Sequence, residues 1–250
     1  MDPIVTAAVT SFATTIATNG TKAPLETLDN LWYLAFGRLN LFAEKKKAQH
    51  QRSLEEYKDS IAEKIISIDE NDLQEPQMSV VGPALEASKY YIEEESLREM
   101  FANIIAASMD KNKASIVHHS FVEIIKQLSP EDARNIQLFK TSSEYPIVKF
   151  VINFHSGGHG VIKTNVFHGS KSDIEHGDEN ASSITNLSRL GLVSISYEES
   201  FSDKSNYVLY RNSTFFSLLA NHPSPNGTFE IMEGTLRLSP LGEDFIKICL

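Results

Sequence analysis

Apolar residues recur at helical spacing through the first half of the chain. Within residues 22–67 they alternate steps of three and four, which predicts one or two long helices with a shared apolar seam. The seam positions are Leu25, Leu28, Trp32, Ala35, Leu39 and Phe42. Pro76, Gly82 and Pro83 then interrupt the pattern, and residues 84–110 are predicted to resume as a helix. The core-facing stripe of that helix comprises Leu97, Met100, Phe101, Ile104, Ile105 and Ser108.

The periodicity changes after about residue 142. The stretch "YPIVKFVINFHSGGHGVIKTNVFHG" alternates β-prone residues around Gly157 and Gly158, which predicts a β-hairpin. Residues 181–250 then predict a short helix, a strand, two strands joined by a Glu-Gly turn, and a closing helix. This order resembles a winged-helix unit, a likeness of fold that carries no function with it.

These patterns predict an α+β fold that is mainly α. We expect a helical bundle over residues 1–141, a β-hairpin and polar loop over 142–180, and a winged-helix-like region over 181–250. The first twenty residues, "MDPIVTAAVTSFATTIATNG", indicate an amphipathic helix and lack the basic start of a signal peptide. We therefore expect a cytoplasmic protein.

Two helix starts are predicted in "SIVHHSFVEIIKQLSPEDA", residues 115–133. Ser120 and Glu123 have the spacing of a capping box, in which each side chain binds the other residue's amide. Ser129 is predicted to cap the next helix, because a proline at the first turn and two acidic residues near the positive helix end follow it. Both segments are therefore interpreted as structural.

The adjacent His118 and His119 raise three alternatives: metal ligands, a catalytic acid and base, or part of a helix start. A residue directly before a cap can fold against the helix as a hydrophobic staple, which favours the structural alternative for His119. Elsewhere, His155 and His159 flank a glycine turn, so they lose the shared helical face that a chelating pair needs. We expect no metal, no cofactor and no catalytic residues.

Composition and charge narrow the classes of partner. Hydrophobic and charged residues make up 41% and 22% of the chain, as in ordinary soluble proteins, and the single cysteine fits a reducing compartment. The net charge of −10 is concentrated in residues 53–110, which carry fourteen acidic and four basic side chains. Such an acidic field repels phosphate backbones, so a nucleic-acid partner is disfavoured.

The apolar segment "LWYLAFGRLNLFA", residues 31–43, has two interpretations. It is shorter than the roughly 20 residues that a spanning helix needs, so a buried bundle helix is favoured. The following "EKKK" leaves open an interfacial helix on anionic lipid. The candidate surface for a partner protein or a membrane comprises Leu31, Trp32, Leu34, Phe36, Arg38 and Leu41.

Several phrases resemble the abortive-infection alpha (Abi-alpha) family of bacteria. They are "PALEASKYY", an acidic run, "LREMFANIIAASMD" and "SFVEIIKQLSPEDA", most specific over residues 83–133, with further similarity at "LWYLAFGR" and "LSRLGLV". The family-like positions are Pro83, Leu85, Glu86, Met100, Phe101, His118, Ser120, Phe121, Leu128, Ser129, Pro130 and Asp132. One departure is His119, which stands where family members often have proline. The resemblance implies a mainly helical bacterial protein of phage defence, which kills or arrests the infected cell.

The sequence therefore predicts a non-enzymatic anti-phage protein that acts through protein contacts, as a sensor or adaptor. Its partner would be a phage component, a toxic protein or a second copy of the chain. The main alternative is a membrane-associated effector that uses the N-terminal apolar helices. Further alternatives are a winged-helix DNA-binding regulator and a metal-dependent hydrolase.

Overall fold

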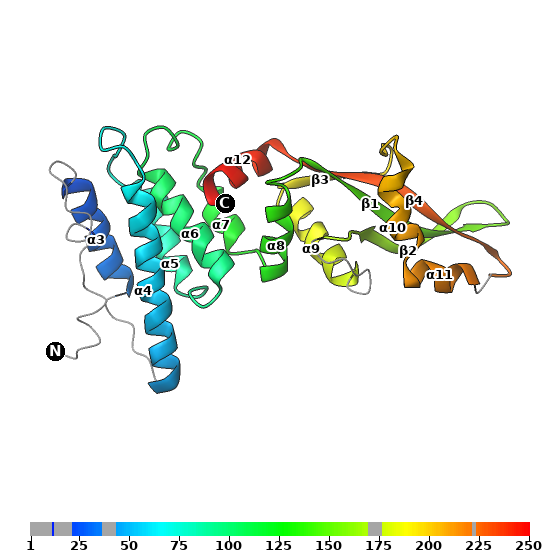
Figure 1. The fold of residues 1–250 in the computed structure, drawn as a ribbon, viewed down its shortest axis with the longest axis horizontal. Coiled ribbons are helices and arrows are strands. Elements are labelled where there is room, and N and C mark those ends of the chain that lie inside the picture. Colours follow the sequence, from blue (N-terminus) through cyan, green and yellow to red (C-terminus); the bar gives the residue numbers. More distant parts are fainter. Residues whose placement is uncertain (1–11, 13–21, 37–43, 170–176, 222–223) are drawn as a thin grey trace. The chain divides into compact units, whose positions relative to one another are not determined.

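The computed structural model describes Phe12 and residues 22–36, 44–169, 177–221 and 224–250. It contains helices and an antiparallel sheet, which confirms the α+β class (Figure 1). Contacts divide the chain into two compact units, residues 1–127 with 247–250, and residues 128–246. These units are defined by contacts between residues, which do not show which segments fold on their own. The domain boundaries predicted at residues 141 and 180 therefore stay predictions.

The first unit is helical. Its elements are α3 (Lys22–Phe36), α4 (Glu44–Ile66), α5 (Met78–Ser88), α6 (Glu95–Ser108) and α7 (Ser120–Ile125). Helix α6 packs against α4, α5 and α7, and every position of its predicted stripe is at most 1% exposed. Burial of each large apolar side chain stabilises the fold by about 1.5–3 kcal/mol, so α6 forms the centre of this unit's core.

The prediction of one helix over residues 84–110 is wrong in one respect, because the structure has two helices there, α5 and α6. Gly82 and Pro83 lie inside α5, and the chain turns instead at residues 89–94. Val81 and Ala84, on either side of the Gly-Pro pair, are both fully buried. We infer that this burial offsets the roughly 3 kcal/mol cost of a proline inside a helix.

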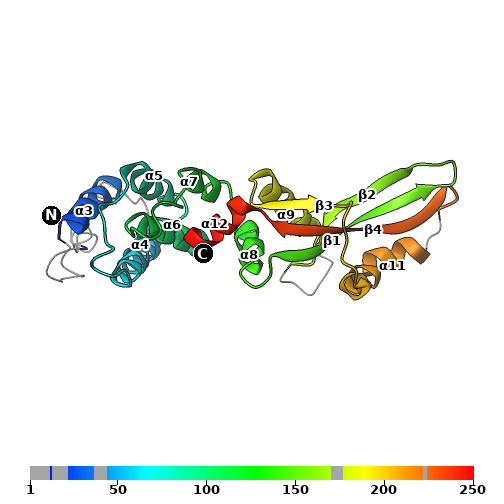
Figure 2. The same ribbon diagram turned by 90° about the horizontal axis from the view of Figure 1, so that it is seen from above.

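The second unit combines a sheet with short helices. Its elements are α8 (Pro130–Leu138), β1 (Glu144–Phe154), β2 (His159–Val166), α9 (Gly177–Arg189), β3 (Val193–Ser196), η2 (Lys204–Tyr207), α10 (Val208–Arg211), α11 (Thr214–Asn221), β4 (Gly227–Leu238) and the start of α12 (Pro240–Cys249). The strand order is β2-β1-β4-β3, and all pairs are antiparallel. Figure 2 shows the long strands β1 and β4 side by side.

The predicted hairpin is confirmed as β1 and β2. Gly157 and Gly158 form its turn with φ of 94° and 81°, a left-handed conformation that favours glycine. One face of this sheet packs against η2, α10 and α11 through buried aromatic residues, including Phe150, Tyr207 and Tyr210. The Tyr210 hydroxyl donates to the carbonyl of Pro146 at 2.7 Å, which joins α10 to the sheet.

The predicted Glu-Gly turn is wrong, because Glu233 and Gly234 lie within the single strand β4. A Cβ at Gly234 would lie 2.4 Å from the backbone oxygen of Ser196 on β3. The glycine therefore permits close approach of two strands. The winged-helix arrangement is not confirmed, since β4 pairs with β1 from the hairpin as well as with β3.

Candidate functional site

The first turn of α8 is fixed by a reciprocal pair of hydrogen bonds. The hydroxyl of Ser129 accepts from the amide of Asp132 at 3.1 Å, and Oδ2 of Asp132 accepts from the amide of Ser129 at 2.7 Å. Pro130 at the first helical position has no N–H to satisfy. The predicted cap at Ser129 is confirmed, and it holds the Asp132 carboxylate at the positive end of the helix.

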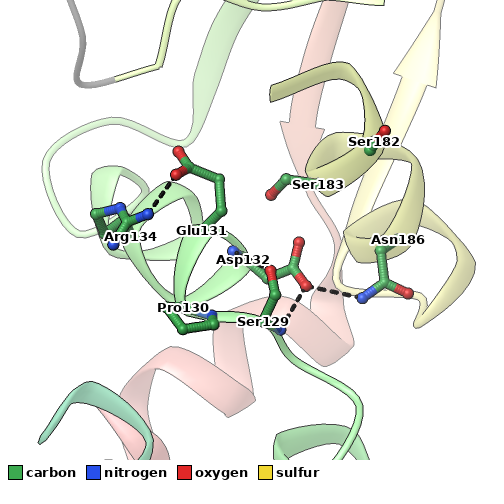
Figure 3. A pocket seen from close by; sticks show the side chains of 8 residues that line it. All are labelled: Ser129, Pro130, Glu131, Asp132, Arg134, Ser182, Ser183 and Asn186. Carbon is green, nitrogen blue, oxygen red and sulfur yellow. Dashed lines mark hydrogen bonds and ion pairs between the residues drawn. The ribbon is translucent and has the colours of Figure 1, made fainter. Parts of the chain in front are cut away.

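Helix α9 supplies a second donor to the same carboxylate. Nδ2 of Asn186 donates to Oδ2 of Asp132 at 2.9 Å (Figure 3). Asp132 is only 2% exposed, and its other oxygen, Oδ1, has no hydrogen-bond partner among the described residues. In Figure 3 that oxygen points away from Asn186, toward Ser183. A buried acceptor without a donor costs about 1–3 kcal/mol, so Asp132 is poised to accept a further hydrogen bond.

A second buried polar group lies one turn further along α8. Nδ2 of Asn135 donates to Oδ1 of Asn180 at 3.1 Å and to Oγ of Ser183 at 2.9 Å. Asn180 in turn donates to the backbone carbonyls of residues 167 and 168. Gly169 has φ of 64°, and a Cβ there would lie 2.9 Å from Oδ1 of Asn135. These bonds tie α8, α9 and the end of β2 into one polar layer.

Beside this layer is a pocket of about 500 Å³ between α8 and α9. It is lined by Ser129, Pro130, Glu131, Asp132, Arg134, Ser182, Ser183 and Asn186 (Figure 3). Glu131 and Arg134 form an ion pair on α8, with the Arg134 side chain half exposed. The volume falls in the range of ligand pockets, and seven of the eight lining residues are polar or charged.

The groups in the pocket are suited to recognition through hydrogen bonds. Hydroxyl, amide and carboxylate groups converge from two helices, and the buried carboxylate already accepts two N–H donors. The lining contains no histidine or cysteine. The groups held in fixed positions there are therefore hydrogen-bond acceptors.

The structure separates the family-like positions into three settings. Ser129, Pro130 and Asp132 line the pocket. The apolar members are buried in cores: Leu85, Met100, Phe101, Phe121 and Leu128. Glu86 is exposed and pairs with Lys89, and Pro83 lies within α5. The segment at the start of α8 is therefore the part of this resemblance that lines the pocket between α8 and α9.

His118 and Ser120 lie outside any described pocket or cluster. His118 is exposed, and its Nδ1 lies 2.6 Å from Oγ of Ser120 and accepts the Ser120 amide at 3.2 Å. The capping box predicted for Ser120 and Glu123 is wrong: His119 occupies the N-cap position in a helical conformation, and Glu123 pairs with Lys126. No group of three or more His, Cys, Asp or Glu side chains in the described residues is placed to hold a metal ion.

The predicted partner or membrane surface is divided in the structure. Trp32 and Phe36 are each 4% exposed and pack with Tyr57 of α4, at ring distances of 5.6 and 6.3 Å. Leu34 is 75% exposed and Leu31 is half-buried. Arg38 and Leu41 lie outside the described residues. Of the described helices, none is long and apolar enough to cross a bilayer.

The sequence prediction missed the contribution of α9 to the pocket. Asn180, Ser183 and Asn186 recur every three residues, which places polar side chains on one helical face. Such a polar stripe between buried Ile184 and Leu187 is a signal that sequence reasoning could have used. Which residues of α8 it meets depends on contacts more than 40 positions apart in the chain.

Comparison with known proteins gives one match. The family model described as abortive infection alpha matches residues 49–249, which include both helices of the pocket. No curated protein and no solved structure matches the chain significantly. Since the matched residues make up most of the chain, it belongs to the abortive infection alpha family.

Proposed function

We propose that this chain acts in abortive infection as a non-enzymatic recognition protein, with the pocket between α8 and α9 as its binding site for another protein. Family membership suggests the abortive-infection role. The observation that carries the binding site is the buried Asp132 carboxylate beside an accessible pocket, with one oxygen still lacking a donor. The partner is a phage component or a toxic protein of the host cell.

A protein partner fits the construction of the site. The acceptors are held by helix ends and by buried amide bonds, so they are fixed before a partner arrives. Preorganised groups lose little conformational entropy on binding, which favours specific recognition. Ser182 at the exposed side of α9 and Arg134 on α8 would form the rim that the partner covers.

The proposal is tested by filling the pocket without touching its polar layer. Ser182→Phe places a large side chain at the exposed edge of the lining, while Ser182→Ala leaves the space open. Gln137→Phe adds the same bulk at an exposed position of α8 outside the lining. We expect only Ser182→Phe to remove protection, measured as efficiency of plating and survival of infected cells.

Two results with these variants would contradict the proposal. If the Ser182→Phe protein has an unchanged melting temperature and still protects cells fully, the pocket is not the recognition site. If Gln137→Phe also removes protection, the loss follows from added bulk on this unit and the proposal again fails. A pull-down from infected cells should recover a partner with the wild-type chain and lose it with Ser182→Phe.

A second candidate function is a membrane-associated effector, favoured by two exposed side chains on α3. Leu34 is 75% exposed and Tyr33 is 57% exposed on the same helix. Side chains of this kind insert at the lipid interface. In this case the variant Tyr33→Ser with Leu34→Ser would lose co-flotation with vesicles of phosphatidylglycerol and phosphatidylethanolamine. Full protection by that variant would exclude this candidate.

A further inference from the structure

The pocket has an uncompensated negative charge. Its lining contains two carboxylates and one guanidinium, and Glu131 is paired with Arg134. The remaining charge is that of Asp132, which is buried and offers Oδ1 as an acceptor. One turn further along α8, Oδ1 of Asn135, which does not line the pocket, is a second buried acceptor without a partner in the described part of the chain. Within the pocket, Oδ1 of Asp132 lacks a donor, and the charge of the carboxylate favours a cationic one.

We infer that the pocket binds the guanidinium group of an arginine side chain on the partner protein. This inference rests on the proposed recognition function and names its chemistry. A guanidinium is planar and carries five N–H donors, so it can reach acceptors on α8 and α9 together. Its pairing with Asp132 would be a charge-assisted hydrogen bond, the stronger kind in proteins.

An anionic ligand is disfavoured although the pocket lies at a helix start. The start of a helix attracts anions, but Asp132 itself occupies that position and takes the Ser129 amide through Oδ2. A phosphate would therefore lie beside a buried carboxylate and be repelled. Arg134 does not reverse this, because its guanidinium pairs with Glu131 on the same helix.

The probe is argininamide, titrated into the full chain, with citrullinamide as its uncharged isostere. We expect argininamide to shift the side-chain amide signals of Asn186 in NMR spectra, because Asn186 shares the Asp132 carboxylate. Citrullinamide should bind at least tenfold more weakly. Spermidine, a cation without a guanidinium, should also bind more weakly than argininamide.

The key variant is Asp132→Asn, which keeps the shape and one acceptor oxygen but replaces the free oxygen by a donor. Its matched control is Glu94→Gln, which removes one charge from an exposed residue of the acidic helical block. We expect Asp132→Asn to weaken argininamide binding at least tenfold and Glu94→Gln to change it less than twofold. Ser182→Phe, which leaves the helix cap intact, should also abolish the shift.

Several outcomes would overturn the guanidinium assignment. They are equal binding of citrullinamide, tighter binding of spermidine, unchanged binding to a folded Asp132→Asn protein, or shifts with inorganic phosphate and none with argininamide. Any of these would leave the recognition function intact if Ser182→Phe still removed phage protection. Full protection by Ser182→Phe would instead reject the recognition function, whatever argininamide does.

Discussion

Ser120 and Ser129 show that the backbone conformation of the N-cap residue decides whether a capping box forms. Each serine is followed three positions later by an acidic residue, yet only Ser129 forms the box. Ser129 has extended backbone angles, φ of −83° and ψ of 165°, which let its hydroxyl meet an amide of the first turn. Ser120 is already helical, because His119 before it has φ of −56° and ψ of −31°.

This difference predicts unequal effects of two identical substitutions. Ser129→Ala should lower the free energy of unfolding by about 1 kcal/mol, since it leaves the Asp132 amide without its acceptor. Ser120→Ala should change it by less than about 0.5 kcal/mol, because only an exposed contact with His118 is lost. Urea denaturation followed by circular dichroism measures both. Equal losses would mean that the capping geometry has no special weight.

Glu233 gives a second prediction at this scale, on pH. Burial raises the pKa of Glu233, but hydrogen bonds from Lys204 and Arg211 outweigh it and hold the pKa below its ordinary value of 4.5. A carboxyl whose folded pKa is lowered adds stability above the unfolded pKa, and that stability is lost as pH falls through the folded pKa. The contribution is therefore present at neutral pH.

We expect Glu233→Gln to destabilise the protein by about 1 kcal/mol at pH 7, the scale of partly exposed ion pairs. The difference from wild type should shrink as the pH falls from about 5 to about 3, because the wild-type carboxyl becomes protonated. Unfolding by urea at a series of pH values measures it. A difference that stays constant over this range would contradict the role given to the two ion pairs.

Among the elements, the Gly-Gly hairpin and the α8 cap were predicted from local chemistry, whereas two apparent breaks in the sequence proved to lie inside longer elements. The Gly157-Gly158 hairpin and the α8 cap follow from short-range rules, and both were predicted. Gly82-Pro83 and Glu233-Gly234 look like breaks in the sequence but lie inside α5 and β4. In each case, neighbours distant in sequence decide the structure. The α8 side of the pocket was predicted as a capped helix start and α9 as a short helix, but their meeting at a pocket was not predicted.

The role of Gly234 can be tested against another glycine of the same sheet. Gly234→Ala should cost of order 2 kcal/mol, because its Cβ would lie 2.4 Å from the backbone oxygen of Ser196, which cannot rotate away. Gly160→Ala should cost less, since its nearest contacts, at 3.2 Å, are side-chain atoms of Ile152 and Phe154. Thermal unfolding compares them. A larger loss for Gly160→Ala would contradict this account of β4.

At the scale of the whole molecule, the charge distribution limits the partners. The chain has a net charge of −10, and most of the acidic excess lies in residues 53–110, within the helical unit. Residues 181–250, where a winged helix was predicted, carry five basic and seven acidic side chains. Neither region offers the basic surface on which phosphate binding depends.

We therefore expect no retardation of duplex DNA in gel-shift experiments, even at about 50 mM salt, where phosphate contacts are strongest. The measurement should use the full chain at micromolar concentration and a mixed-sequence duplex. A shift that weakens steeply with added salt would show that local basic groups overcome the overall charge. The DNA-binding alternative would then replace protein recognition as the leading proposal.

Residues 247–250 belong to the first unit although they are translated last, which has a consequence for synthesis on the ribosome. Ile248 and Cys249 are buried, and the Cys249 carbonyl accepts from Nδ2 of Asn103 at 2.9 Å. A nascent chain thus has almost the whole helical unit translated while one piece of its interior is still missing. Domains usually mature in order of emergence, but the helical unit lacks its last four residues until the second unit has been translated. Premature termination would therefore damage the part of the protein that was synthesised first.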